Sequence, residues 1–436
     1  MTRDPDWLLD GLSALQREHL LRPRRLVQPL GPGRSRIDGH DVIDFSSNDY
    51  LGLARDSRLT RAAAGVPAGA GASPLVSGRS EHFCQLEHDI AEFEQAEAAL
   101  LFPSGFAANL GTVTALVSNG DAVFSDRLNH ASLIDGCRLS RARLYVYHHT
   151  RLEQLEHKLA NAADAPRRLI VTDGLFSMDG HLAPLESLCQ LAKSYDAMLL
   201  VDEAHATGVL GQHGRGSCES LGVEDQVTLR IGTLSKAVGA AGGFVVGSRA
   251  LVDYLWHHAR TQVFSTAIPP ATCAAASKAL ELIQLEPDRR THLEQLARQL
   301  RQHLNDLKLV TPSVVGPIVP VIVGSATAAL DASRLLAEKG LFVPAIRPPT
   351  VPDGSAWRGD WTFWSNQFFY EPAKGNWTVA VSDLAKNFTG VLSAVELTVR
   401  GTAIDDTDND GLDDNWETEQ FGSLGQAALG DPDRDG

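Results

Sequence analysis

The most chemically informative residue of this chain is Lys236, which follows Thr233 and precedes a glycine-rich stretch at residues 239–243. Asp202 and His205 lie upstream, at the end of an apolar, strand-like run. An amine that condenses with an aldehyde and a carboxylate that keeps a pyridine nitrogen protonated are what pyridoxal phosphate chemistry requires. The hydroxyl groups and glycines near the lysine suit a phosphate. These residue types predict a pyridoxal phosphate site with Lys236 and Asp202 at its centre.

A lysine after a strand is usually a solvated surface residue, so the prediction depends on the other expected strand ends. Five expected strands are each followed by polar residues, at the edge where open parallel sheets place active sites. In chain order these are Ser104–Asn109, Asp126 to His130, Ser177, Asp202–His205 and Thr233–Lys236. The backbone amides at a helix start near Gly105 suit an anion. The competing nucleotide-binding interpretation fails because the sequence has no Gly-x-Gly-x-x-Gly fingerprint and no P-loop.

The elements that must position these residues follow from the hydrophobic pattern. Between about residues 98 and 250, nearly unbroken apolar runs alternate with helical periodicity, which predicts an α/β domain with a parallel sheet covered on both faces. An amphipathic helix is expected from Trp7 to about Leu21. A long helix is expected from about residue 271 to 307, then a strand at 318–323, a helix at 327–339 and a strand at 341–346. The last three predict a second, smaller α/β domain that is incomplete.

Charge marks a boundary near Ser355. From there to the end the chain has 15 acidic and 5 basic residues, so this tail carries −10 of the net charge of −15. An acidic chain argues against nucleic acid as a partner. The expected organisation is an N-terminal helix and arm (1–45), a large cofactor-binding domain (46–270), an incomplete small domain (271–354), a β-rich fragment (355–403) and an acidic tail (404–436).

The chain has 436 residues, of which 43% are hydrophobic and 21% are charged. This composition is typical of an ordinary soluble protein. The N-terminus has no signal-peptide pattern, and no run is long and apolar enough to span a bilayer. The five cysteines show no metal-type spacing, so reduced thiols are expected. These observations predict a cytoplasmic protein without a membrane partner or a catalytic metal.

Several motifs together resemble the α-oxoamine synthases, which are pyridoxal phosphate enzymes of aminotransferase fold type I. They are Asn48–Leu53, Leu75–Gly78, Ser104–Asn109, Asn129–Ser132, Asp202–Gly208, Thr233–Gly243 and Phe264–Ala267. The resemblance covers roughly residues 5–354. Within this family the chain is most similar to the branch that makes 8-amino-7-oxononanoate for biotin synthesis, helped by the run at residues 346–352. The resemblance implies a large mixed-sheet domain and a smaller α/β domain.

The resemblance also implies roles for individual residues. Lys236 would bond to the cofactor aldehyde, Asp202 would pair with the pyridine nitrogen, and His130 would stack on the ring. The other implied cofactor contacts are His205 and Ser177 near the phenolic oxygen, the amides of Gly105 and Phe106 with Thr233 at the phosphate, and Thr266 at the phosphate of a partner subunit. The implied substrate contacts are Arg22, Asn48, His130 and Thr350.

The activity that the resemblance implies is a decarboxylative condensation of L-alanine with a pimeloyl thioester, carried by coenzyme A or acyl carrier protein. The product would be 8-amino-7-oxononanoate, and the cross-subunit contact implies a homodimer. Another α-oxoamine synthase, which joins glycine or serine to a different acyl thioester, is the nearest alternative. From a different class, the chain could be a calcium-binding β module attached to an inactive α/β body.

The chain departs from the family pattern after about residue 354. Relatives continue into a strand with an arginine for the amino acid carboxylate and then a closing helix, and neither is visible here; Arg347 lies upstream of that position. We therefore expect impaired catalysis. Residues 361–399 instead resemble the second half of the P domain of proprotein convertases. Residues 406–414 resemble a thrombospondin type 3 calcium repeat, with a disordered acidic tail as the alternative.

Both tail resemblances are to secreted proteins, whereas the body is typical of a cytoplasmic enzyme. We therefore interpret the chain as a chimera, produced by gene rearrangement or by sequence assembly. A continuous in-frame read of native DNA across the codons for residues 345–365 would contradict an assembly error.

Overall fold

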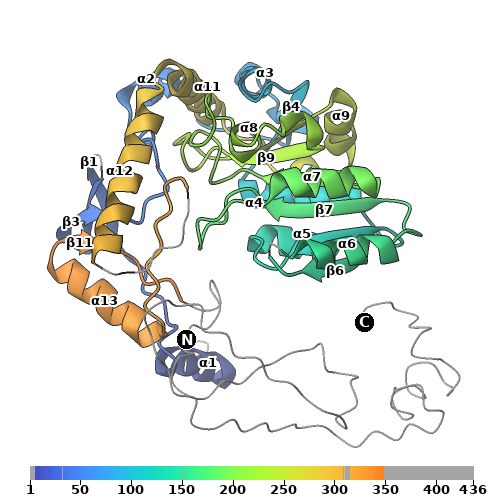
Figure 1. Cartoon of the computed structure of the whole chain (residues 1–436). Coiled ribbons are helices and arrows are strands. Elements are labelled where there is room, and N and C mark those ends of the chain that lie inside the picture. The colour runs from blue at the N-terminus through green and yellow to red at the C-terminus, as the bar shows by residue number, and fades with distance from the viewer. Residues whose placement is uncertain (1–4, 32, 150, 308, 310–314, 348–436) are drawn as a thin grey trace, which may run out of the picture. The chain divides into compact units, whose positions relative to one another are not determined.

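The structure is a computed structural model that describes residues 5–31, 33–149, 151–307, 309 and 315–347. Within these residues the chain forms a seven-stranded main sheet with helices around it, and a separate four-stranded sheet (Figure 1). The chain divides after Arg358 into two units, and all described residues belong to the first. The domain boundaries expected from the sequence stay predictions.

The main sheet is mixed, with one strand running against the others. Its order is β4-β10-β9-β8-β7-β5-β6. The strands are β4 (Ala98–Phe102), β5 (Ala122–Asp126), β6 (Arg143–Tyr147), β7 (Arg168–Asp173), β8 (Met198–Asp202), β9 (Leu229–Thr233) and β10 (Gly243–Gly247). β10 is antiparallel to both neighbours, and the other pairs are parallel. The α/β class predicted from the apolar runs is confirmed.

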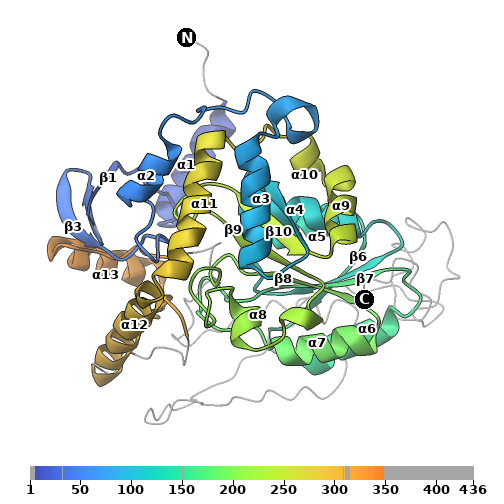
Figure 2. The same cartoon turned by 90° about the horizontal axis from the view of Figure 1, so that it is seen from above.

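Helices cover both faces of the main sheet, as expected for buried parallel strands. The larger ones are α3 (Glu81–Phe93), α4 (Gly105–Leu116), α5 (Ala131–Ser140), α6 (Leu152–Asn161), α7 (Leu185–Ser194), α9 (Arg249–His258) and α11 (Pro270–Leu285). One apolar cluster joins α4, α5 and α9 to one face, and two other clusters join α3, α11, α6 and α7 to the opposite face. In Figure 2, α6 and α7 run side by side along one side of the sheet.

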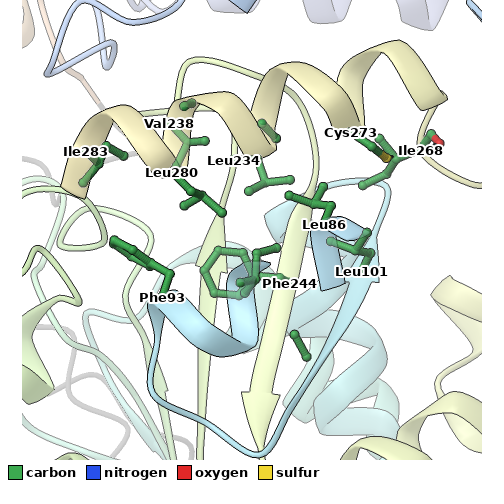
Figure 3. Packing of buried hydrophobic residues seen from close by; sticks show 14 of the residues in the cluster. Leu86, Phe93, Leu101, Leu234, Val238, Phe244, Ile268, Cys273, Leu280 and Ile283 are labelled. Carbon is green, nitrogen blue, oxygen red and sulfur yellow. Dashed lines mark hydrogen bonds between the residues drawn. The ribbon is translucent and has the colours of Figure 1, made fainter. Parts of the chain in front are cut away.

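The cluster under α3 and α11 packs against the edge strand β4 and its neighbour β10. Figure 3 shows Phe244 of β10 and Leu101 of β4 among Leu86 and Phe93 of α3 and Leu280 of α11. Each of these side chains is at most 4% exposed. Burial of a large apolar side chain stabilises a fold by about 1.5 to 3 kcal/mol, so this cluster fixes the edge of the sheet next to the β9–β10 connection.

Side-chain alternation along the strands decides which polar groups meet. On β8, Leu200 packs in the cluster with α4 and α5, so Asp202, two positions on, points to the same face. By the same count Asp173 follows Val171 on β7, and Thr233 follows Ile231 on β9. Three neighbouring strands therefore end with polar side chains on the face that α4 and α5 cover.

Short elements connect the larger ones. They are α2 (Ser57–Ala63), a single π-helical turn η1 (Pro74–Gly78), α8 (Ser217–Ser220), the 3₁₀ turn η2 (Glu224–Gln226) and α10 (Arg260–Val263). A network of ion pairs holds the start of α2 to the end of α11, because Arg58 contacts Asp56 and Glu286, and Arg289 contacts the same two carboxylates.

The four-stranded sheet has the order β1-β2-β3-β11. β1 (Val27–Gly31), β2 (Arg34–Ile37) and β3 (His40–Asp44) form an antiparallel meander, and β11 (Leu341–Phe342) pairs in parallel with β3. The expected helix and arm over residues 1–45 did not include this meander, so that expectation was incomplete. The first helix is α1 (Asp6–Arg17), which ends four residues before the expected Leu21.

The expected strand at residues 318–323 is wrong: no strand forms there, and the expected strand at 341–346 contains only the two residues of β11. Proline explains both differences, because Pro320 and Pro344 lack the backbone N–H that a sheet ladder needs. The helix between them was predicted correctly, and α13 spans Ala326–Glu338.

The single long helix expected over residues 271–307 is two helices. α11 ends at Leu285, and α12 (Asp288–Asp306) begins after Pro287. Pro287 cannot donate a helical hydrogen bond, and its ring clashes with the preceding turn of a continuous helix. The residues of the expected tail domains, 355–436, lie outside the described part of the chain.

A tight backbone approach anchors the connection between β9 and β10. Gly239 has φ +71°, and a Cβ added there would lie 2.4 Å from the Ala54 nitrogen. Gly239→Ala should therefore lower the free energy of unfolding by about 2 to 4 kcal/mol, through backbone strain and overpacking. Gly222→Ala is the matched control, because Gly222 has φ +66° and nothing within 4 Å. Urea denaturation of both variants checks this, and equal losses would contradict it.

Candidate active site

The five central residues of the predicted site come from five places in the fold that meet at one edge of the main sheet. Asp202 ends β8 and Thr233 ends β9. Lys236 lies in the connection between β9 and β10. Gly105 begins α4, and His130 is the N-cap residue of α5. The carboxyl ends of the parallel strands and the N-terminal ends of two helices therefore surround the lysine.

Asp202 is a buried carboxylate with donors on both oxygens. Its side chain accepts a hydrogen bond of 2.6 Å from the Asn109 amide and one of 2.8 Å from the backbone nitrogen of Ala204. The residue is 6% exposed. Hydrogen bonds to the charged form stabilise a buried carboxylate, so the site provides a fixed negative charge.

Lys236 lies half-buried near two carboxyl groups. Burial lowers the pKa of its amine, and the Asp202 carboxylate opposes that shift. The connection that carries it is closed by backbone hydrogen bonds from Leu234 to Gly242 (3.0 Å) and from Gly239 to Lys236 (2.9 Å). A lysine with a lowered pKa holds more neutral amine at pH 7, which favours attack on an aldehyde and proton transfer.

Asp173 is a second buried carboxyl group beside Asp202. The two residues are direct neighbours in the register of β7 and β8. The Asp173 side chain accepts a hydrogen bond of 3.1 Å from the backbone nitrogen of His130. Burial raises the pKa of Asp173 well above its usual value, and the neighbouring charge of Asp202 raises it further. Burial beside Asp202 therefore favours the neutral form of the Asp173 carboxyl group.

His205, in the loop after β8, contacts Tyr50, which was not among the predicted site residues. The Tyr50 hydroxyl lies 2.7 Å from Nδ1 of His205 and 3.2 Å from Oδ1 of Asn48. Burial lowers the pKa of His205 to about 3, and the charge of Lys236 contributes. Burial also raises the pKa of Tyr50. His205 is therefore a neutral imidazole whose ring position Tyr50 fixes.

The start of α4 forms a cradle with the expected phosphate ligands. Ser104 caps the helix through the Ala107 amide at 3.1 Å, which leaves the first amides of the helix, those of Gly105 and Phe106, to bind an anion. A Cβ at Gly105 would lie 3.3 Å from Oγ1 of Thr233, so the hydroxyl sits directly beside this helix start.

Pyridoxal phosphate fits the groups that the structure gathers here. The edge offers an amine, a charged carboxylate, a neutral imidazole and a helix start with an adjacent hydroxyl, which match the aldehyde, pyridine nitrogen, phenolic oxygen and phosphate of the cofactor. Buried polar atoms without a protein partner also lie on these elements, among them Oδ1 of Asp173 and Oγ1 of Thr207. A bound ligand would supply the hydrogen-bond partner that the protein does not give these atoms.

The remaining predicted site residues lie on other segments or outside the described residues. Ser177 is in the loop after β7, which the Leu175–Leu182 bridge closes. Thr266 is exposed after α10, Asn48 is exposed before Tyr50, and Arg22 is exposed after α1. Thr350 lies outside the described residues, so its predicted role stays a prediction.

A family model for the class I and II aminotransferases matches residues 40–358. The chain belongs to this family. Its curated relatives include the 8-amino-7-oxononanoate synthase of Symbiobacterium thermophilum, 46% identical over 356 residues, which are 80% of this chain and 91% of the relative. The enzyme of the same name from Anaeromyxobacter sp. (strain K) is 48% identical over 358 residues, or 80% and 89% of the two chains.

Solved structures agree with this assignment. A serine palmitoyltransferase from S. paucimobilis with a bound PLP–myriocin aldimine has a TM-score of 0.76 and 29% identity, and the match covers 80% of this chain and 90% of that one. The 8-amino-7-oxononanoate synthase of Francisella tularensis has a TM-score of 0.62 and 31% identity, covering 71% and 89%. The predicted fold type and the pyridoxal phosphate cofactor are confirmed.

A second family model, for the P domain of proprotein convertases, matches residues 352–399. This confirms the predicted resemblance of the tail and places the change of family at about the residue where the charge balance changes. The predicted calcium site concerns residues outside the described part and stays a prediction.

Three residues at the site edge had no role in the sequence analysis: Asp173, Tyr50 and Asn109. Asp173 could have been predicted from the pattern that identified Asp202, because both residues end apolar strands. Asn109 and Tyr50 stand inside motifs that were noted, but no local signal shows that their side chains meet Asp202 and His205 across more than 90 residues of sequence.

The neutral state of His205 predicts a pH dependence of stability. The pKa of His205 is about 3 in the folded chain, compared with 6.5 for an unperturbed histidine. The unfolded chain therefore binds more protons between these values, and stability falls as the pH falls from 6.5 towards 3. At pH 5 the loss should be on the order of 1 to 2 kcal/mol.

His205→Asn keeps an acceptor for Tyr50 and should remove this part of the loss. Thermal unfolding of the cofactor-free protein between pH 7.5 and 5 measures it, with the exposed His257→Asn as control. An unchanged slope in His205→Asn would contradict the prediction.

Proposed function

We propose that this chain is a pyridoxal phosphate-dependent acyltransferase that condenses L-alanine with a pimeloyl thioester. The products are 8-amino-7-oxononanoate, carbon dioxide and the free thiol of coenzyme A or acyl carrier protein. The observation that carries the proposal is the identity to the 8-amino-7-oxononanoate synthases over about nine-tenths of their length, together with the buried Asp202 beside Lys236.

The proposed roles follow the chemistry of each group. Bound pyridoxal phosphate supplies an electron sink for negative charge on the carbon next to the substrate amine. Asp202 keeps the pyridine nitrogen protonated, and Lys236 holds the aldehyde at rest and carries the alanine α-proton during turnover. His130 packs on the ring face, and the neutral His205, with Ser177, donates to the phenolic oxygen.

The anion-binding and substrate-binding groups complete the proposal. The Gly105 and Phe106 amides and the Thr233 hydroxyl hold the phosphate, as expected for a helix N-terminus. Arg22, Asn48 and Thr350 contact the substrate, with His130 shared between ring and substrate.

A second candidate is another α-oxoamine synthase reaction, with serine and a longer acyl thioester. The fold match to a serine palmitoyltransferase supports it, whereas the higher identity to 8-amino-7-oxononanoate synthases favours alanine and a pimeloyl group. We also propose a cytoplasmic location. The five cysteines, all within the described residues, are unpaired, and thiols stay reduced in that compartment. In the described part of the chain no helix has the length and apolar character needed to cross a membrane.

Product formation tests the activity. Purified full chain with pyridoxal phosphate, L-alanine and pimeloyl-CoA should release thiol and 8-amino-7-oxononanoate, detected by mass spectrometry, and Lys236→Ala should abolish both signals. Lys193→Ala on the opposite face of the sheet is the control. Product only with serine and a long-chain acyl-CoA would replace the first candidate with the second.

The same assay measures the effect of the changed C-terminus. Because the sequence after about residue 354 departs from the family pattern that carries an arginine for the substrate carboxylate, kcat/KM for alanine should be about 10- to 100-fold below that of an 8-amino-7-oxononanoate synthase assayed in parallel. Equal values would contradict the expected impairment.

We further propose a homodimer in which Thr266 reaches the partner's cofactor phosphate. Two exposed apolar side chains support it: Val76 of η1 is 79% exposed, and Phe264 beside Thr266 is 72% exposed. The two segments are joined, because the Ala267 nitrogen donates to the Ala72 carbonyl at 3.0 Å. A shared apolar patch of this kind is typical of an interaction surface.

Phe264→Asp should convert the dimer to a monomer, because it places a charge in the proposed interface. Light scattering measures the mass, and Leu139→Asp is the control, since Leu139 is 63% exposed on α5. A monomeric wild type, or a Phe264→Asp variant that remains dimeric, would refute the proposed interface.

A further inference from the structure

Four side chains form an unbroken hydrogen-bond chain from the carboxylate of Asp202 to the ring of His130. The Asn109 amide nitrogen lies 2.6 Å from Oδ2 of Asp202 and 2.9 Å from Oγ of Ser132. The same Oγ lies 2.7 Å from Nδ1 of His130. The members come from β8, α4 and the start of α5, so the chain spans three elements.

The donor and acceptor roles along this chain are determined by chemistry. An ionised carboxylate only accepts, so Asn109 must turn its NH₂ group towards Asp202, and its second hydrogen goes to Ser132. The Ser132 hydroxyl oxygen accepts that bond, and its own hydrogen is donated to Nδ1 of His130. That nitrogen also lies 3.3 Å from the backbone nitrogen of Ser132, which can only donate. Nδ1 therefore carries no proton, and the ring proton is on Nε2.

Burial of Asn109 and Ser132 keeps these donor and acceptor roles fixed. Asn109 is 2% exposed and Ser132 is fully buried. The side-chain oxygen of Asn109 has no protein partner, yet the amide cannot turn over, because its oxygen would then face the Asp202 carboxylate. Low-dielectric surroundings strengthen such networks and penalise an unpaired member. The charge on Asp202 thus fixes each group in turn.

We propose that Asn109 and Ser132 are positioning residues that couple the Asp202 carboxylate to His130 and hold its imidazole neutral, with the proton on Nε2. The proposal rests on the proposed function for the roles of Asp202 and His130 at the cofactor. It adds that the ring orientation and tautomer of His130 are consequences of the charge on Asp202. Independently of the chain, burial lowers the pKa of His130, which agrees with a neutral ring.

The chain has a functional consequence for a ring that packs on the cofactor. A neutral imidazole with its proton on Nε2 presents no positive charge to the protonated pyridine ring, and its face is held in one orientation. Without the hydroxyl of Ser132, Nδ1 loses its main donor, so the other tautomer becomes accessible and the ring can turn.

The tautomer is measurable directly. The full chain is labelled with ¹⁵N-histidine and studied with and without pyridoxal phosphate, and His130 is assigned by the signal missing in His130→Asn. The wild type should show an unprotonated Nδ1 and a protonated Nε2. Ser132→Ala and Asn109→Leu should each shift Nδ1 towards the protonated range and lower kcat about 5- to 10-fold, with little change in KM for alanine.

Matched variants separate positioning from general damage. Ser140→Ala removes another buried hydroxyl of α5, which donates to the Cys137 carbonyl at 2.7 Å, and should leave the His130 signals unchanged. Ser132→Cys keeps a weaker donor and should lie between wild type and Ser132→Ala. Adding Ser132→Ala to Asn109→Leu should have a smaller effect than Ser132→Ala alone, because the two residues belong to one chain.

The outcomes decide the proposal without relying on activity. A proton on Nδ1 in the wild type, or an unchanged tautomer in folded Ser132→Ala and Ser132→Cys, would overturn it. If the wild type binds no cofactor, the proposed function fails, whereas the tautomer measured in the cofactor-free protein still tests the hydrogen-bond chain.

Discussion

Keeping a charged carboxylate inside the protein is the constraint on which the site depends. Asp202 is nearly inaccessible to water, so its charge must be stabilised by fixed donors rather than by solvent. Those donors are Asn109 from α4 and the backbone of Ala204. Through Asn109 the carboxylate links α4 to the end of β8. It adds to the burial that raises the pKa of Asp173, and it opposes the burial that lowers the pKa of Lys236.

Strand alternation explains why much of this site was predictable from sequence. Asp202, Thr233 and the start of α4 each follow a continuous apolar strand, and parallel strands bring their carboxyl ends to one edge. Local pattern was therefore sufficient for the large sheet and for the helix start at Gly105 beside Thr233. The apolar pattern gave wrong elements at Pro287 and Pro320. Proline lacks the backbone N–H that a helix or sheet needs, and this loss prevents the element even where the neighbouring residues favour it.

Contacts between distant segments were not predictable from the single sequence. Tyr50 contacts His205 from a segment whose residues 53 and 54 lie against Gly239 of the β9–β10 connection. The β1–β3 meander likewise has short, mostly exposed strands with little apolar alternation. Where a side chain's partner depends on the packing of a remote loop, no local composition records it.

The antiparallel strand β10 constrains the segment that carries Lys236 in a way that a parallel neighbour of β9 would not. Because β9 and β10 pair directly, the segment that carries Lys236 is a closed hairpin, whereas parallel neighbours need a long crossover. Closing such a short loop costs little chain entropy. The lysine is therefore preorganised by its own two strands before any ligand arrives, and binding energy need not be spent on ordering the nucleophile.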